Sequence, residues 1–148
     1  PGLRLGFAVA PEPVISAMAA LQPTWSVNAL AQAAGLAALD ATEHWDQSVR
    51  ALAGAKDYLE TALAGLGLAV HPSAANFLLV DAVSGRGGFA SGGALRRALL
   101  REGCCVRDCA SFGLPGHVRI GVRTLPECRI LVAALRRVLG EARATEVG

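Results

Sequence analysis

The sequence is short of lysine, of metal-ligand spacings and of long apolar runs, and each shortage excludes a class of protein. Only Lys56 among the 14 basic residues is a lysine, so lysine chemistry has one candidate position in this chain. No stretch approaches the roughly 20 apolar residues that cross a bilayer. The net charge of +2 is small and scattered, unlike that of a nucleic-acid-binding protein. We therefore expect no nucleic-acid partner and no membrane partner.

The cysteines form no metal-binding or disulfide pattern. None of the four belongs to a C-x-x-C pair, and the three histidines fall in no zinc-ligand spacing with them. We expect no metal and no disulfide, but reduced and mostly buried thiols. The N-terminal residues PGLRLGFAVA lack the basic segment and apolar core of a secretion signal. We therefore expect a cytoplasmic protein. The cysteines are Cys104, Cys105, Cys109 and Cys128.

A chain of 148 residues is long enough to bury a genuine core. Hydrophobic periodicity, together with glycine and proline breaks, predicts alternating helices and strands. Strands are expected at 3–9, 68–70, 76–80, 104–107 and 118–122, and helices at 14–21, 26–39, 42–66, 93–102 and 126–141.

Four segments carry more specific expectations. The strand at 3–9 begins with almost no residues before it, so its pairing partners on at least one side are expected to be missing from this chain. The helix at 26–39 is apolar on nearly every face, which is typical of a buried helix. Lys56 interrupts the apolar stripe of the long helix, and we expect its ammonium group to lie in water. The tail after Gly140 is expected to fray.

The segment from Gly103 to Thr124 contains the candidate site. Arg119 and Arg123 alternate along one strand with valine and isoleucine, so they lie on the face opposite the packed one. Arg107 ends the preceding strand, and Gly121 leaves room between the two arginines. This pattern favours an anion-binding socket, or equally a solvated sheet face that carries arginines. Thr124 and Glu127 form a predicted capping box for the last helix.

The last six elements, in the order β-β-α-β-β-α, predict a small sheet with helices on one face, so the fold class is α/β. The helices before this unit are too apolar for a free-standing domain.

Four segments resemble one known family when they are taken in order. PGLRLGFAVA, QPTWSVNALAQ, ANFLLV and VRDCASFGLPGHVRIGVRT are similar to the C-terminal half of fold-type-I, pyridoxal-phosphate (PLP) dependent enzymes. Within that family the likeness is to threonine-phosphate decarboxylases of cobalamin biosynthesis first, and to histidinol-phosphate aminotransferases next. The resemblance covers essentially the whole chain.

The resemblance implies a domain division and a set of site residues. Residues 1–10 would be the last strand of the large PLP domain, 11–40 interdomain helices, and 41–148 the C-terminal small domain. Arg4 would bind the cofactor phosphate. The substrate-binding residues would be Arg119, Arg107 and Asn28, and the substrate would be a phosphorylated amino acid. No catalytic residue lies in this chain by that comparison.

The resemblance also implies what this chain lacks. The lysine that carries PLP would precede residue 1, so we expect a C-terminal half that is inactive alone and a parent enzyme that is a homodimer. The rival interpretation is a stand-alone α/β module that binds a small anion. Pairing of Leu3–Val9 within this chain would favour the module, and an unpaired segment would favour the missing half.

Lys56 is predicted not to bind PLP covalently, because it lies in mid-helix and far in sequence from the arginines. Mixing the chain with PLP and recording its absorbance tests this, with Lys56→Ala as the matched control. A stable band of a PLP imine that is lost in Lys56→Ala would contradict the prediction.

Overall fold

The computed structural model describes residues 3–84 and 88–146, with side chains as far as residue 140. The chain divides into two compact units, residues 1–47 and residues 48–148, which are described separately here as the N-terminal and C-terminal units. In both units, no helix of the described ranges is long and apolar enough to cross a membrane.

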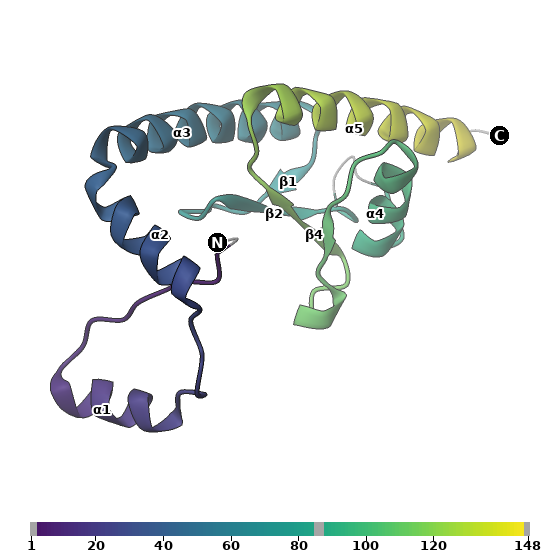
Figure 1. Cartoon of the computed structure of the whole chain (residues 1–148). Helices are drawn as coiled ribbons and strands as arrows, with labels where there is room; N and C mark the ends of the chain where they lie inside the picture. Colours follow the sequence, from purple (N-terminus) through teal and green to yellow (C-terminus); the bar gives the residue numbers. More distant parts are fainter. Residues whose placement is uncertain (1–2, 85–87, 147–148) are drawn as a thin grey trace. The chain divides into compact units, whose positions relative to one another are not determined.

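The N-terminal unit contains helices α1 (Glu12–Leu21) and α2 (Ala29–Asp40) and the first turns of α3 (Thr42–Gly65) (Figure 1). Pro11 precedes α1 and a second proline lies in its first turn, where a missing N–H costs no hydrogen bond. Asn28 caps α2, because its side-chain oxygen accepts a hydrogen bond from the N–H of Ala31 at 2.8 Å. Both predicted helices are present, but their starts differ from the predicted ones: α1 begins at Glu12 and not at 14, and α2 begins at Ala29 and not at 26.

Two predictions for this unit are wrong. Residues 4–11 form no strand, because a strand needs a neighbouring strand for its N–H and C=O groups, and none of the described strands pairs with them. Helix α2 is not buried either: only Ala31 is covered, while Leu30 is 82% exposed. Within the described residues, the side chain of Leu5 lies against α2 at Gly35, while most of the apolar surface of the helix stays exposed. An unpaired segment at 3–9 is the outcome that disfavours a self-contained module.

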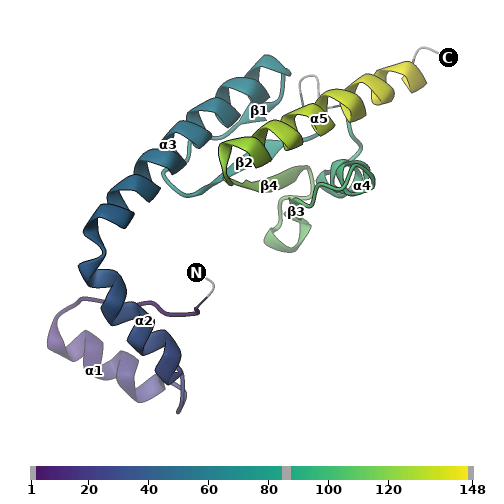
Figure 2. The ribbon, with the colours of Figure 1, turned by 45° about the horizontal axis from the view of Figure 1, so that its top comes forward.

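The C-terminal unit is built on a four-stranded antiparallel sheet. Its strands are β1 (Ala69–Val70), β2 (Phe77–Asp81), β3 (Arg107–Asp108) and β4 (His117–Gly121), in the order β1-β2-β4-β3. The helices of this unit are the remainder of α3, then α4 (Gly92–Arg101) and α5 (Leu125–Glu146). Figure 2 shows α3 and α5 side by side across one face of the sheet. The predicted β-β-α-β-β-α order with helices on one face is confirmed.

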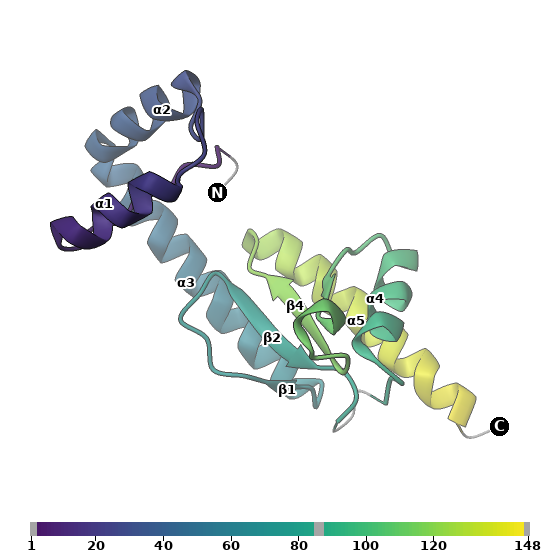
Figure 3. The ribbon, with the colours of Figure 1, turned by 90° about the horizontal axis from the view of Figure 1, so that it is seen from below.

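The pairing of β2 with β4 separates a buried face from an open one. Leu78 lies opposite Ile120 and Val80 opposite Val118, and all four side chains are buried. The alternate positions of β4, which include Arg119, point to the other face and are exposed or half-buried. Seen from below in Figure 3, the sheet lies in front of α3 and α5, and these helices leave that face open.

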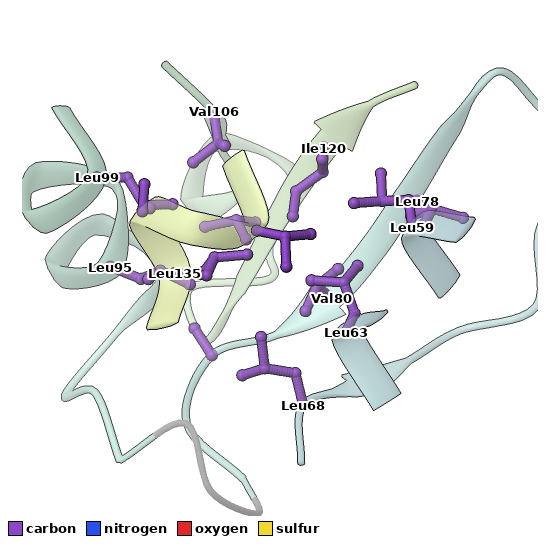
Figure 4. Packing of buried hydrophobic residues seen from close by; sticks show 14 of the residues in the cluster. Leu59, Leu63, Leu68, Leu78, Val80, Leu95, Leu99, Val106, Ile120 and Leu135 are labelled. Carbon is purple, nitrogen blue, oxygen red and sulfur yellow. The ribbon is translucent and has the colours of Figure 1, made fainter. Parts of the chain in front are cut away.

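One hydrophobic core holds the helices on the sheet (Figure 4). Every helix of the unit contributes fully buried leucines, and the sheet contributes its inward-facing aliphatic side chains. Burying a side chain of this size stabilises the fold by about 1.5–3 kcal/mol. The largest members are Leu59, Leu63, Leu78, Leu95, Leu99, Ile120 and Leu135.

Lys56 does not extend into water, contrary to the prediction. Its side chain is 16% exposed and lies 4.0 Å from the carboxylate of Glu60. Its ammonium group also donates a hydrogen bond to the carbonyl oxygen of Ser73. The segment between β1 and β2 supplies this partner, so a distant tertiary contact decides where the lysine lies.

Other predicted boundaries shift. The strand expected at 104–107 is reduced to Arg107–Asp108, so Cys104 and Cys105 are not on opposite faces of a strand. The last helix continues to Glu146 and does not fray at Gly140. The capping box is half formed: the carboxylate of Glu127 accepts from the N–H and the hydroxyl of Thr124, at 3.1 and 2.6 Å.

Gly92 is predicted to tolerate no side chain. It begins α4, its N–H donates to Pro115 at 2.8 Å, and a methyl group there would overlap the carbonyl of His117. Gly92→Ala should lower the free energy of unfolding by about 1–3 kcal/mol or more. Gly54→Ala is the matched control, because Gly54 lies in the interior of α3 with no atom near the added methyl. It should raise stability by about 0.5–1 kcal/mol. Equal effects of the two changes in urea unfolding would refute this account.

Asp81 is predicted to make the fold sensitive to acid. Hydrogen bonds from Ser84, and more weakly from the N–H of Val83, lower the pKa of Asp81 from 3.8 to about 2. Because its pKa is depressed in the folded state, its contribution is complete above about pH 4 and is lost as the pH falls toward 2. Asp81→Ala should therefore destabilise the chain at pH 7 by about 0.5–1.5 kcal/mol. The difference in free energy of unfolding between Asp81→Ala and the unsubstituted chain should shrink as the pH is lowered. A difference that does not depend on pH would show that the charge of Asp81 is not its cause.

Candidate anion site

Arg107 and Arg119 lie directly opposite each other on neighbouring strands. The register of β3 with β4 pairs the two residues, so their side chains leave the sheet on the same face. Both are exposed, on the face that α3 and α5 leave open. The two arginines therefore lie on neighbouring strands and face one side of the sheet, as the predicted anion-binding socket requires.

Two phenylalanine rings hold the guanidinium groups in place. Arg119 lies over Phe77 of β2 with its guanidinium carbon 5.0 Å from the ring centre, and over Phe112 at 6.0 Å. Arg107 lies over Phe112 at 5.5 Å. These distances are within the range of a cation–π attraction, which contributes about 0.5–1 kcal/mol at an exposed site. One ring, Phe112, therefore contacts both arginines.

The positive charge of the two arginines is not neutralised locally. In the described ranges, neither guanidinium has a carboxylate within ion-pair distance. Arg107 donates a hydrogen bond to the hydroxyl of Ser111 at 3.3 Å, a neutral partner. The carboxylate of Asp108 accepts instead from the N–H of Ala110 at 2.8 Å. Two guanidinium groups with spare donors form a favourable site for an anion.

Arg123 differs from the other two. Its side chain is 72% exposed and makes an ion pair of 3.0 Å with Glu127, four residues later in α5. The hydroxyl of Thr124 and then Arg123 lower the pKa of Glu127, so this carboxylate stays charged. Arg123 also lines a separate cavity of about 220 Å³ together with Cys105 and Ile130. Arg123 is therefore neutralised locally and does not join Arg107 and Arg119.

The open face carries titratable neighbours that the sequence pattern did not single out. The Nε2 atoms of His71 and His117 are 3.1 Å apart, and His117 lies opposite Asp81. Cys109 is buried beside the arginines, and burial raises the pKa of its thiol. All four cysteines are free thiols, two of them buried. In the part of the chain that the structure describes, no three His, Cys, Asp or Glu residues gather as metal ligands.

Arg4 and Asn28 belong to the N-terminal unit, and their assigned roles stay predictions. Arg4 is exposed and has a backbone φ of +56°. Asn28 is exposed, and its side-chain oxygen is used as the cap of α2, which leaves its amide N–H groups for a ligand.

The described residues fit one part of a PLP site and not another. An exposed arginine such as Arg4 suits a cofactor phosphate. Lys56 does not suit the cofactor aldehyde, because its ammonium group already bonds to Ser73 and lies near Glu60. Of these two described residues, therefore, Arg4 suits the phosphate of the cofactor and Lys56 does not suit its aldehyde.

The sequence did not reveal the two phenylalanines. Phe77 reaches Arg119 only because β2 pairs with β4. Leu79 of β2 is the partner of Arg119, and Phe77 lies two residues before Leu79. Phe112 reaches both arginines because a short 3-10 helix, Ala110–Phe112, folds back beside β3. For Phe112, the signal in the sequence was an aromatic residue between Ser111 and Gly113 in a loop marked by glycine and proline.

Comparison with known proteins agrees with this architecture. The chain is 44% identical over 140 residues to the histidinol-phosphate aminotransferase of Symbiobacterium thermophilum, a match that spans 95% of the chain and 37% of that relative. L-threonine-O-3-phosphate decarboxylase from Porphyromonas gingivalis is similar in structure, with a TM-score of 0.76, 28% identity, and coverage of 95% of this chain and 43% of that one.

Aspartate aminotransferase from Thermus thermophilus with maleate is similar too, with a TM-score of 0.75 and 30% identity over 93% of this chain and 37% of that one. The chain thus spans about two-fifths of the length of each of these proteins. The model of the family described as aminotransferase class I and II matches residues 1–135, through both units and the arginine pair. This chain therefore belongs to the class I and II aminotransferase family, whose enzymes depend on PLP.

Proposed function

We propose that this chain supplies the substrate-anion site of a PLP-dependent enzyme that transaminates a phosphorylated amine of the histidinol-phosphate type. The observation that carries the proposal is the pair Arg107 and Arg119, placed opposite each other on an open sheet face without a local carboxylate. The 44% identity to a histidinol-phosphate aminotransferase supports this choice of reaction and substrate.

In this proposal the arginines bind and orient the substrate. A guanidinium group meets a carboxylate or phosphate with two parallel hydrogen bonds, so it fixes the direction of the anion as well as its position. Fixing one end of the substrate brings its reacting carbon to a defined place and reduces the entropy lost at the reactive step. PLP, when bound, supplies the electron sink for that step. Arg4 is proposed to hold the phosphate of PLP, and Asn28 to contact the substrate.

Decarboxylation of threonine phosphate is the second candidate. The sequence resemblance placed it first, and the structural likeness to a threonine-phosphate decarboxylase over 95% of the chain supports it. The curated relative supports transamination at higher identity. A stand-alone anion-binding module has less support, because the family match extends through the N-terminal unit as well.

We also propose that further protein covers the N-terminal unit, either the rest of the enzyme or a second copy in a homodimer. Large apolar side chains are exposed there: Trp25 is 95% exposed and Phe7 is 92% exposed. Large apolar side chains left exposed in this number favour an interface with further protein.

Arg119→Ala is predicted to impair the enzyme far more than Arg123→Ala. Arg119 has no carboxylate partner in the described structure, whereas Arg123 is neutralised by Glu127. A hydrogen bond to a charged group contributes about 1.5–3 kcal/mol, so kcat/KM should fall roughly ten- to a hundredfold in Arg119→Ala. Arg123→Ala should change it less than threefold. The measurement uses the complete PLP-loaded enzyme that contains this chain.

The same preparation distinguishes the two candidate reactions. Histidinol phosphate with an oxo-acid acceptor should be consumed by transamination, and threonine phosphate should release no carbon dioxide. Release of carbon dioxide would reverse the order of the candidates. Unchanged turnover in Arg119→Ala would show that the arginine pair does not bind the substrate.

A further inference from the structure

Phe112 occupies a position that core packing does not explain. It is 58% exposed, and it ends a 3-10 helix of three residues, Ala110–Phe112. Gly113 follows with a φ of +76°, a left-handed conformation that turns the chain sharply after the ring. The start of this turn is fixed by Asp108, which accepts from the N–H of Ala110. The backbone therefore presents the ring at a defined place beside the sheet.

The ring stands where two like charges would otherwise repel. Arg107 and Arg119 are paired in register, and like charges directly opposite on neighbouring strands destabilise a sheet. Long arginine side chains relieve this repulsion by swinging apart into solvent. Phe112 opposes that movement, because both guanidinium groups lie over the same ring, at 5.5 and 6.0 Å.

We propose that Phe112 is a positioning residue that holds the two guanidinium groups together and thereby makes the site prefer phosphate to a single carboxylate. The inference rests on the proposed function of the arginine pair and specifies its ligand class. A carboxylate has two oxygens in one plane and is satisfied by a single guanidinium fork. A phosphate carries up to two charges and three acceptor oxygens, so it gains from a second guanidinium held nearby.

The partners on the other side of each arginine are consistent with this role. Arg119 is held from β2 by Phe77 at 5.0 Å, so removal of Phe112 leaves it one aromatic contact. Arg107 is left with only the hydrogen bond to Ser111 at 3.3 Å. Loss of the Phe112 ring should therefore release Arg107 first, and it should affect a ligand that needs both arginines more than a ligand that needs one.

The test is a titration of the full chain with inorganic phosphate and, separately, with acetate. The side-chain Nε–H signals of the arginines are followed by NMR at pH 8, where inorganic phosphate carries nearly two charges. Phosphate should shift the signals of Arg107 and Arg119 and bind more tightly than acetate. Phe112→Leu should weaken phosphate binding about five- to tenfold and change acetate binding less than twofold.

Further variants separate positioning from folding. Phe112→Tyr keeps the ring face and should restore the affinity for phosphate, whereas Phe112→Met fills similar space without a ring and should behave as Phe112→Leu does. Leu114→Ala, in the same loop and 38% exposed, is the matched control and should leave both affinities unchanged. Thermal unfolding of each variant reports whether it is folded.

The outcomes also separate this inference from the proposed function. If Arg119→Ala loses phosphate binding while Phe112→Leu and Phe112→Met keep it, the arginine site stands and the role of Phe112 is refuted. If Arg119→Ala binds phosphate as tightly as the unsubstituted chain, the anion site itself is wrong. Equal losses for phosphate and acetate in Phe112→Leu would refute the selectivity.

Discussion

The alternation of β4 constrains the rest of the C-terminal unit. Val118 and Ile120 are buried against Val80 and Leu78 of β2, so the residues between them must face the other way. A slip of one residue would bury Arg119 in an apolar core and expose the aliphatic side chains. The hydrophobic core thus fixes the direction of the arginine.

That constraint explains which parts could be predicted from the sequence. The direction of Arg119 follows from a two-residue period that is visible in β4 itself. The length of β3 cannot be predicted in this way, because the chain just before it completes the end of α4. Gly103 adopts a left-handed conformation, and the N–H of Cys104 donates back to Leu99 at 2.9 Å. A run of β-favouring residues therefore became the cap of a helix, and only Arg107–Asp108 remained to pair.

The other errors came from contacts that no local pattern encodes. Lys56 reaches the carbonyl of Ser73, 17 residues away, because the connection between β1 and β2 folds back toward α3. Phe112 meets two arginines through the pairing of β3 with β4. Leu3–Val9 has strand composition but no described strand to pair with. Periodicity predicts which face of an element is apolar, whereas the partner of that face depends on the tertiary fold.

The two classes of arginine in one segment show why charge alone did not identify the site. Arg123 stands at the start of α5, where a positive charge is unfavourable, and Glu127 compensates it one helical turn later. Arg119, four residues earlier, faces Arg107, and among the described residues its guanidinium group contacts aromatic rings and no carboxylate. Like charges opposite each other cost a sheet up to about 1 kcal/mol. A carboxylate in the neighbouring strand would remove this cost. That the arrangement keeps the cost supports the anion site that we propose, because the stability of the fold alone does not require two facing arginines.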